Sequence, residues 1–517
     1  MTDHKIFTKA FILFTLLVAL APFVHSQTLD DKLKEIDDYA NAVMDTWKGP
    51  GMAIAVVKDD KVVMAKGYGV RELGKPEKVD ENTLFAIASN TKAFTAASLA
   101  ILVDEKKIAW DDKVSKYLPE FQMYDPWVTS ELTIRDLVSH RVGLDTFSGD
   151  LLWYDTTYPT DEILRRVRFL KPVSSFRTKF GYQNLMYIAA GRVVEKASGM
   201  KWADFVRTRI LEPLGMTRTT TSVRDMKDNF AMPHNESGGS LRALPPGYLD
   251  DAIGAVRLNS SVSDLAKWIR LQLGRGAFEG KQIWSSARSN DMWQPNIMIP
   301  IGEGQLKTNP THHFSSYGMG WFLDEYYGHK VMNHSGGLDG MLSYTVLIPD
   351  ENIGFVILTN NESPAYRVMM AKMRDVFLNA PKTDWLQRGK DQFAANKASE
   401  AEADKKSDEA RLPNTKPSLP LSSYAGTYTS QMYGDVTIAE ENGKLVMRLV
   451  PSPNFVADLE HWQLDTFRIH WRPTVHYDFP RGFVTFSIDK DAKTDQLKID
   501  QPNNDFWFYE LDLHRTK

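Results

Sequence analysis

The chain has 517 residues, a formal net charge of −4 and a hydrophobic content of 43%. This length exceeds what one hydrophobic core usually organises, so we expect two domains. The 62 basic and 66 acidic residues nearly cancel, which gives no electrostatic argument for a nucleic-acid or anionic-membrane partner. The absence of cysteine excludes disulfides, thiolate metal sites and lipid attachment through an N-terminal cysteine.

Residues 1–26 have the features of a cleavable signal peptide. Two lysines precede an apolar run over residues 10–24, and the small residues Val24 and Ser26 predict cleavage before Gln27. The alternative is a membrane anchor, but about 15 apolar residues fall short of the ~20 that span a bilayer. We therefore expect a bacterial protein, periplasmic or secreted, with no membrane attachment after cleavage. A secreted chain without disulfides agrees with that location.

Residues 27–383 carry strand patterns at both ends and mostly helical patterns between them. The chain is expected to begin with an amphipathic helix, because apolar residues recur at helical spacing over residues 29–47. Strands are predicted at residues 52–57, 62–70, 329–333, 342–348 and 353–359. Strands from both ends with helices between them predict an α+β fold, in which an antiparallel sheet is flanked by helices and an all-helical subdomain.

The composition changes after residue 383. Residues 384–416 are rich in charge and alanine without a core-facing stripe, and predict a solvated helical linker. Residues 417–517 alternate between polar and apolar side chains and predict a small all-β barrel or sandwich, which we expect to be a separable domain. Its strands are predicted at residues 424–429, 436–439, 445–449, 467–471, 483–488 and 506–511.

Ser89 and Lys92 form the first candidate site. They lie three residues apart at the start of an apolar helix pattern, so both side chains share one helical face. A lysine in a dry pocket loses its charge readily and can take a hydroxyl proton, which would activate the serine as a nucleophile. The alternative is an ordinary helix cap. The same pattern recurs at residues 198–201 and 487–490, but there it ends a helix or lies within a strand.

Two further motifs follow in the chain. Tyr182-Gln183-Asn184 offers a phenol that could relay a proton and an amide that could hold a carbonyl group. The alternative for Tyr182 is a packed core tyrosine. At the end of a predicted strand, His334-Ser335-Gly336-Gly337 allows a substrate to lie close to the backbone. It also offers an N–H group that could join that of Ser89 in an oxyanion hole. The alternative there is a glycine turn.

In this order and on these elements, the three motifs resemble the serine β-lactamase and penicillin-binding-protein superfamily, specifically its class C-like branch of peptidases and esterases. The resemblance covers about residues 30–380. Within that range, the segments that carry the resemblance, besides the three motifs, are residues 82–89, 108–119, 132–140, 180–187, 211–216 and 259–266. The C-terminal region resembles the lipocalin-like barrels that some relatives append.

The resemblance implies roles for the motif residues. It implies that Ser89 is the acylated nucleophile and that Lys92 and Tyr182 share the acid/base work, in an order that the sequence leaves open. It also implies that Asn184 orients the substrate, and that the backbone N–H groups of Ser89 and Gly337 bind the oxyanion. His334, Ser335 and Gly336 would then line the substrate site. No cofactor and no metal is expected, since the two histidines at 312–313 lack a metal-ligand spacing.

Two departures from the superfamily pattern affect the functional prediction. Relatives commonly read His-Thr-Ser-Gly-Leu where residues 140–144 read His-Arg-Val-Gly-Leu, so we interpret His140 as structural. True β-lactamases carry lysine at the position of His334, and a neutral histidine would hold a substrate carboxylate poorly.

The leading hypothesis is an envelope serine hydrolase that forms an acyl-enzyme on amide or ester bonds. Its substrates would be small molecules or peptides, including peptides with D-residues, as for a D-aminopeptidase or an esterase. The alternatives are a β-lactamase or D,D-carboxypeptidase and, in another class, a non-catalytic binding or scaffolding protein. Assembly into a homo-oligomer is left open.

Overall fold

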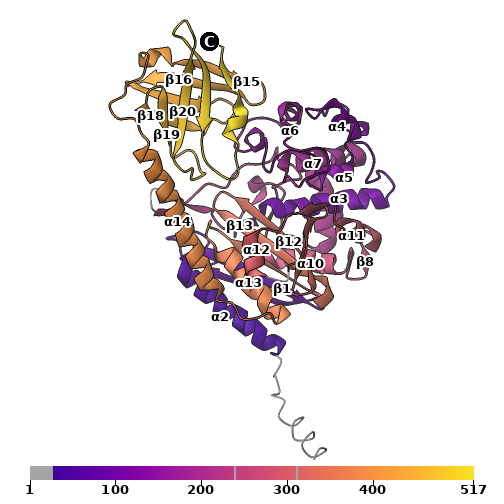
Figure 1. Cartoon of the computed structure of the whole chain (residues 1–517). Helices are drawn as coiled ribbons and strands as arrows, with labels where there is room; N and C mark the ends of the chain where they lie inside the picture. Colours follow the sequence, from indigo (N-terminus) through magenta and orange to yellow (C-terminus); the bar gives the residue numbers. More distant parts are fainter. Residues whose placement is uncertain (1–26, 238–239, 310–311, 517) are drawn as a thin grey trace, which may run out of the picture.

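The computed structural model describes residues 27–237, 240–309 and 312–516, so the predicted signal peptide lies outside the described residues. The chain forms a central sheet with helices on both faces, a helical region above it and a C-terminal barrel (Figure 1). Within these ranges, no helix has the length and apolar character needed to cross a membrane.

The central sheet confirms the predicted α+β fold. Its eight antiparallel strands follow the order β2-β1-β14-β13-β12-β11-β10-β9, so strands from the two ends of the domain lie side by side. Strands β9 to β11 were not predicted, because three to five residues are too few to show an alternating pattern. The strands are β1 Gly51–Lys58, β2 Lys61–Gly69, β9 Ile297–Ile299, β10 Ser315–Tyr317, β11 Phe322–Tyr326, β12 His329–Leu338, β13 Met341–Ile348 and β14 Ile353–Thr359.

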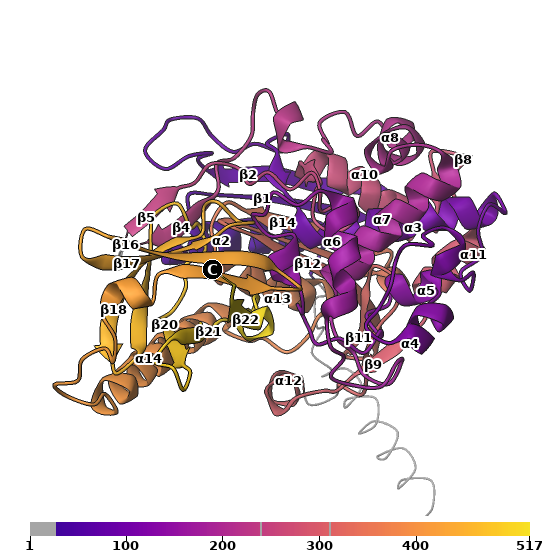
Figure 2. The same ribbon diagram turned by 90° about the horizontal axis from the view of Figure 1, so that it is seen from above.

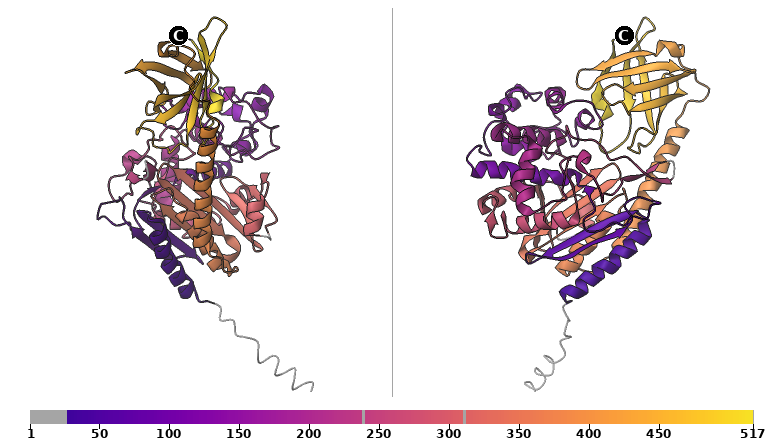
Figure 3. Two further views of the ribbon diagram at one scale, coloured as in Figure 1. Left: turned by 60° about the vertical axis from the view of Figure 1, so that its left-hand side comes forward. Right: turned by 180° about the vertical axis from the view of Figure 1, so that it is seen from behind.

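Both faces of the sheet are covered, which explains why β1 is apolar along nearly its whole length. Ala53, Ala55 and Val57 face the core that contains α3, α7 and α10. The alternate residues, such as Ile54 and Val56, face a second core formed with α2 and α13. Figure 3 shows α2 running along its side of the sheet.

The region between β2 and β9 is largely helical, as predicted. Its helix α3 is buried on nearly every side and carries the Ser89 motif at its start. The helices of this region are α3 Thr91–Asp104, α4 Pro126–Glu131, α5 Ile134–Leu137, α6 Thr160–Arg166, α7 Asn184–Ser198, α8 Trp202–Val206, α9 Glu212–Leu214, α10 Val262–Leu273 and α11 Ser286–Met292. Three short strand pairs also lie there: β3 Phe85–Ala86 with β6 Asn259–Ser260, β4 His234–Ser237 with β5 Ser240–Ala243, and β7 Ala277–Phe278 with β8 Lys281–Gln282. Outside this region lie α2 Leu29–Trp47, α12 Glu303–Thr308 and α13 Ala365–Leu378.

A single exposed helix, α14 (Trp385–Glu409), leads from the sheet to the barrel (Figure 1). The barrel is closed, which confirms the predicted all-β C-terminal region. Its strands are β15 Gly426–Ser430, β16 Gly434–Glu441, β17 Lys444–Leu449, β18 Val456–Gln463, β19 Thr466–Trp471, β20 Gly482–Ile488, β21 Thr494–Asp500 and β22 Leu513–Arg515. Strands β18 and β21 were not predicted.

The predicted strand at residues 506–511 is wrong. Residues Phe508–Leu511 form a short 3₁₀ helix, and the last strand begins at Leu513. The apolar alternation that suggested a strand has another cause: Phe508 and Leu511 are buried in the barrel core, whereas Trp507 and Glu510 contact the neighbouring domain.

The barrel packs directly on the helical region, as Figure 2 shows from above. Buried side chains of the barrel and of the hydrolase core belong to one contacting cluster. The ring of Tyr154 lies 4.4 Å from that of Phe506, centroid to centroid. Tyr158 donates a hydrogen bond of 2.6 Å to the carbonyl of Tyr433. The two domains therefore share an extensive interface in addition to the connecting helix.

Candidate active site

Ser89 lies in a tight turn, η1 (Ala88–Asn90), that runs directly into α3. Ala88 has φ of 47°, a left-handed conformation that a non-glycine residue adopts only when its surroundings hold it. Ser343 accepts a hydrogen bond from Asn90 and donates one to the carbonyl of Ile87, each 2.8 Å long. These contacts fix the turn and leave the half-buried Ser89 accessible at its edge.

Lys92 is fully buried beside Ser89. Its Nζ lies 2.9 Å from Ser89 Oγ, 2.6 Å from Asn184 Oδ1 and 3.2 Å from the carbonyl oxygen of Ala255. Burial lowers the pKa of Lys92 to about 7, while the charge of Asp150 acts in the opposite direction. A substantial fraction of Lys92 is therefore neutral near pH 7 and able to accept a proton.

Tyr182 completes the arrangement around the serine. Its side chain hydrogen-bonds Ser89, and burial raises its pKa well above the ordinary value, so the phenol stays protonated at neutral pH. The ring lies 4.9 Å from Lys92 Nζ and packs against Phe147 at 5.3 Å, centroid to centroid. Tyr182 is thus placed as a proton donor, and Lys92 as the better base of the two.

Asn184 connects Lys92 to a buried carboxylate that the sequence analysis missed. Its amide donates a 2.6 Å hydrogen bond to Asp150, which also accepts one of 2.8 Å from the indole of Trp153. Burial raises the pKa of Asp150 to about 8, while these two donors and the charge of Lys92 oppose that shift. Because Lys92 and Asp150 share Asn184 and act on each other, they titrate as one unit. No local sequence pattern marks Asp150.

The strand motif reaches the nucleophile through its glycines. A Cβ atom on Gly336 would lie 2.2 Å from the carbonyl oxygen of Ile87 and 3.0 Å from the amide nitrogen of Ser89. Only glycine permits this close approach of β12 to the nucleophile turn. Gly337 follows as an exposed residue, and the partly exposed Ser335 precedes the pair.

The side chain of His334 is 1% exposed and points into an aromatic cluster. Its Nε2 lies 3.0 Å from the hydroxyl of Tyr317, and its ring packs against Phe322 at 5.3 Å. Burial, reinforced by the charge of Lys92, lowers the pKa of His334 to about 3. The imidazole is therefore neutral throughout the physiological pH range. The sequence analysis expected a neutral histidine from the ordinary pKa alone, and burial extends the neutral range to lower pH.

His140 also lies against this site. It is fully buried, its Nδ1 accepts a 2.9 Å hydrogen bond from the backbone N–H of Gln183, and its ring packs on Tyr182 at 4.2 Å. Burial lowers its pKa well below the ordinary value. These contacts fit the structural role predicted for His140, which supports the turn before Asn184.

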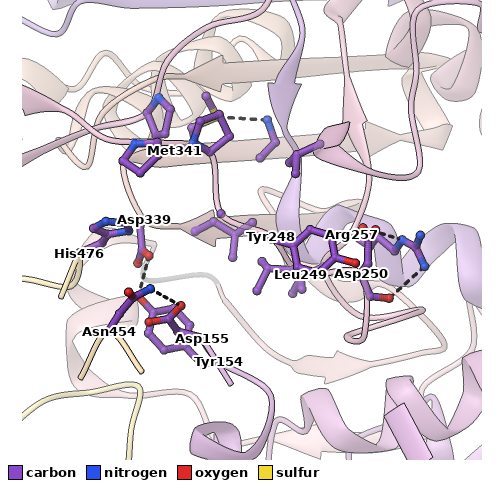
Figure 4. A pocket seen from close by; sticks show the side chains of 18 of the residues that line it. Tyr154, Asp155, Tyr248, Leu249, Asp250, Arg257, Asp339, Met341, Asn454 and His476 are labelled. Atoms are coloured by element: carbon purple, nitrogen blue, oxygen red, sulfur yellow. Dashed lines mark hydrogen bonds and ion pairs between the residues drawn. The ribbon is translucent and has the colours of Figure 1, made fainter. Parts of the chain in front are cut away.

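A cavity of about 390 Å³ lies between the hydrolase domain and the barrel. It borders the site. Its wall includes Ala86, Val256 and Leu338, which in sequence are three residues from Ser89, next to Ala255 and next to Gly337, respectively. Figure 4 shows Tyr154, Asp155, Asp339, Asn454 and His476 gathered at one end of the cavity, with Tyr248, Leu249, Asp250 and Arg257 at the other.

The two ends of the cavity differ in charge. Asp339 accepts a 2.6 Å hydrogen bond from Tyr154, and Asp155 accepts one of 3.0 Å from Asn454. Burial raises the pKa of Asp339 to about 6, so this carboxyl is mostly ionised above neutral pH. Arg257 is the one arginine among the described lining residues, and at the opposite end its Nε lies 3.5 Å from Asp250 Oδ1. One end of the cavity is therefore acidic.

The described ranges contain no group of three or more histidine or acidic side chains arranged to hold a metal ion.

Comparison with known proteins identifies the families of two segments of the chain. Residues 36–377 match the Beta-lactamase family, and residues 410–515 match a domain of unknown function, DUF3471. The chain belongs to the Beta-lactamase family. The first match covers the sheet, the helical region and the motifs of Ser89, Tyr182 and His334, and the second covers the barrel.

The chain has curated relatives within the family. It is 30% identical over 433 residues to the Unguisins hydrolase ungD' of Aspergillus campestris, covering 78% of this chain and 77% of the relative. It is 28% identical over 428 residues to the Unguisins hydrolase ungD of Aspergillus violaceofuscus, with coverage of 77% and 75%. The Protein flp of Staphylococcus aureus is 26% identical over 378 residues, with coverage of 70% and 71%.

Two solved structures share the fold. An octameric penicillin-binding protein homologue from Pyrococcus abyssi aligns with a TM-score of 0.61 at 20% identity, over 91% of this chain and 98% of its own. SurE aligns with a TM-score of 0.55 at 17% identity, over 95% and 100%. At these identities the likeness concerns the fold alone.

Proposed function

We propose that this protein is a serine hydrolase that cleaves amide or ester bonds through an acyl-enzyme, with peptides, including those with D-residues, as its substrate class. The observation that carries the proposal is the buried Lys92 amine, 2.9 Å from Ser89 Oγ and with a pKa lowered to about 7. A non-catalytic scaffold would have no need of a buried lysine, because burying an amine costs stability. The hydrolase names of the Aspergillus relatives support the same class of reaction.

In the proposed reaction, neutral Lys92 takes the proton of Ser89 as Oγ attacks the substrate carbonyl carbon. The resulting oxyanion is stabilised by the backbone N–H groups of Ser89 and Gly337. Tyr182 donates its proton to the departing nitrogen or oxygen and is reprotonated by Lys92. The departure of this group leaves the acyl group on Ser89. Water then attacks the acyl carbonyl carbon with neutral Lys92 as base, the bond to Ser89 Oγ breaks as that oxygen takes the proton back from Lys92, and the acid product leaves.

The pH dependence follows from Lys92. Since the neutral amine is the active base and exists above its pKa, kcat/KM for an uncharged ester should rise with pH through about 7 and then level off. Tyr182 and Tyr187 stay protonated and His140 and His334 stay neutral around that pH. Among these groups packed around Ser89 and Lys92, the Lys92–Asp150 unit therefore dominates the titration, whereas Asp339 in the adjoining cavity has a lower pKa of about 6. A profile of kcat/KM against pH from 5 to 9 measures this rise, the acid limb of the profile. A limb near the ordinary lysine pKa of ~10.4 would contradict the assignment of Lys92 as base.

The substrate should lack a free carboxylate at the strand motif. His334 supplies no positive charge there, and the adjoining cavity is acidic at Asp155 and Asp339. We therefore expect an ester or a D-amino-acid anilide to be turned over at least ~10-fold faster than a chromogenic cephalosporin, since each ~1.4 kcal/mol of discrimination corresponds to that factor. Parallel assays of the three substrates at pH 7 to 8 test this. Rapid cephalosporin hydrolysis would support the β-lactamase alternative instead.

We also propose that the mature protein begins at Gln27 and acts in the bacterial periplasm or outside the cell. The proposal is supported by the charged and apolar pattern of residues 1–26 and by the absence of cysteine.

A further inference from the structure

Residues 145–150 lie against the backbone and side chains of the Tyr182 motif. Each residue of that motif is hydrogen-bonded to this segment, so the segment sets the position of both the phenol and the amide. The contacts are Tyr182 N to Thr146 Oγ1 (3.1 Å), Phe147 N to the carbonyl of Tyr182 (2.8 Å), Gln183 Nε2 to the carbonyl of Asp145, and Asn184 Nδ2 to Asp150 Oδ2 (2.6 Å).

The barrel holds the other side of the same segment. The indole Nε1 of Trp507 donates a 2.6 Å hydrogen bond to the carbonyl of Thr146. The carboxylate of Glu510 accepts two hydrogen bonds, of 2.5 Å from Ser148 Oγ and of 2.9 Å from the backbone N–H of Gly149. Both barrel residues are partly buried, so water competes poorly for these contacts.

The backbone of the segment requires external support. Phe147 has φ of 63°, a left-handed conformation that is unfavourable for a bulky side chain and persists only where neighbours fix it. Gly149 has φ of 77°, and a Cβ atom there would lie 2.5 Å from Leu170 and 2.6 Å from Leu185. A segment of this kind would relax if its outer hydrogen bonds were removed.

We propose that Trp507 and Glu510 of the barrel are positioning residues for the catalytic centre, acting through residues 145–150 on Tyr182 and on the Asp150–Asn184–Lys92 network. The proposal rests on the proposed hydrolase function and assigns the DUF3471 barrel a part in it. Without these contacts, the phenol and the amine lose their alignment with Ser89, and Asp150 moves away from Asn184.

A simple docking role for the barrel is the alternative, and the interface itself offers a matched control. Tyr158 donates a hydrogen bond to the carbonyl of Tyr433 across the same interface, and within the described structure it makes no hydrogen bond to residues 145–150. Tyr158→Phe therefore removes a hydrogen bond between the domains of the same length as that of Trp507 and leaves the segment held.

The test uses the full chain with Trp507→Phe, Glu510→Leu, their double variant and Tyr158→Phe. We expect kcat for an uncharged ester to fall ~10-fold in each single variant and ~10²-fold in the double, since small misplacements of catalytic groups can cost ~10² in rate. KM should change less than about threefold. Tyr158→Phe should keep kcat within about twofold. Glu510→Gln, which keeps one acceptor oxygen, should recover part of the loss.

A second measurement separates positioning from structure. Asp150 raises the pKa of Lys92, so its displacement should move the acid limb of the pH–rate profile to lower pH in Trp507→Phe and Glu510→Leu, as in Asp150→Asn. Glu510→Leu should add little to Asp150→Asn if Glu510 acts through that carboxylate. An unchanged limb in both barrel variants would contradict the proposal.

Hydrogen–deuterium exchange provides a readout that does not depend on turnover. Peptides covering residues 145–150 and 182–184 should exchange faster in Trp507→Phe and Glu510→Leu than in the wild type, and at the wild-type rate in Tyr158→Phe. Wild-type exchange and kcat in the barrel variants, or an equal loss in Tyr158→Phe, would overturn the positioning role. Failure of the hydrolase function would instead appear as an inactive wild type, with the exchange difference preserved.

Discussion

Ser89→Ala should abolish both covalent labelling and turnover. A fluorophosphonate or a slow ester should add its mass to Ser89 in the wild-type protein and to no residue in the variant. We expect kcat to fall by ~10³-fold or more, because loss of the nucleophile from a cooperating unit removes nearly all of the unit's contribution. Ser89 is half-buried at the surface of a turn, so the loss of one hydroxyl should leave the thermal unfolding temperature almost unchanged.

The two other serines with the same spacing serve as controls. Ser198 ends α7, where its hydroxyl donates a 2.6 Å hydrogen bond to the carbonyl of Val194, and Ser487 lies within β20. Within the described residues, neither hydroxyl is hydrogen-bonded to a lysine or a tyrosine side chain, so Ser198→Ala and Ser487→Ala should keep labelling and full activity. Label on either residue, or an active Ser89→Ala variant, would contradict the nucleophile assignment.

The sequence predicted the parts of the site that are encoded locally. Ser89 and Lys92 lie on one helical face because of their spacing, and Tyr182 and Asn184 flank a helix start, so short motifs captured all four. Their resemblance to a known superfamily added the roles. Asp150 was missed because it begins a 3₁₀ helix of only three residues, Asp150–Leu152, which carries no motif, and only the folded chain brings it to Asn184.

Burial was the other property that the sequence could not provide. His334 is neutral because burial and the charge of Lys92 lower its pKa, and the burial comes from an aromatic cluster that includes Tyr317, on a three-residue strand, and Phe322. An isolated motif gives no measure of that environment. The predicted strand at residues 506–511 failed for a related reason, because its alternation reflects contacts with two different partners, the barrel core and residues 145–150.

These differences share a physical origin. Local spacing determines helices, longer strands and motifs, whereas the pKa of a buried group depends on side chains brought together from distant segments. Lys92 illustrates both: its place beside Ser89 follows from three residues of spacing, and its pKa of about 7 follows from complete burial under Asn184, Ala255 and two tyrosine rings.

Lys92 and Tyr182 should behave as one catalytic unit. Both side chains contact Ser89, and the amine lies 4.9 Å from the centre of the phenol ring, so one proton path can run through both. Lys92→Met and Tyr182→Phe should each lower kcat by ~10² to 10⁴-fold, the usual contribution of general acid–base catalysis, with a much smaller change in KM. The double variant should be scarcely slower than the slower single variant, because either change already interrupts the path.

Stability measurements distinguish this result from unfolding. Lys92→Met keeps the length of the side chain but removes a buried amine that is costly to desolvate, so its thermal unfolding temperature should equal or exceed that of the wild type. Tyr182→Phe keeps the ring packed on His140 and Phe147 and should unfold at nearly the wild-type temperature. Losses in kcat that simply multiply in the double variant would show that the two groups act independently, and Tyr182 would then need a proton source other than Lys92.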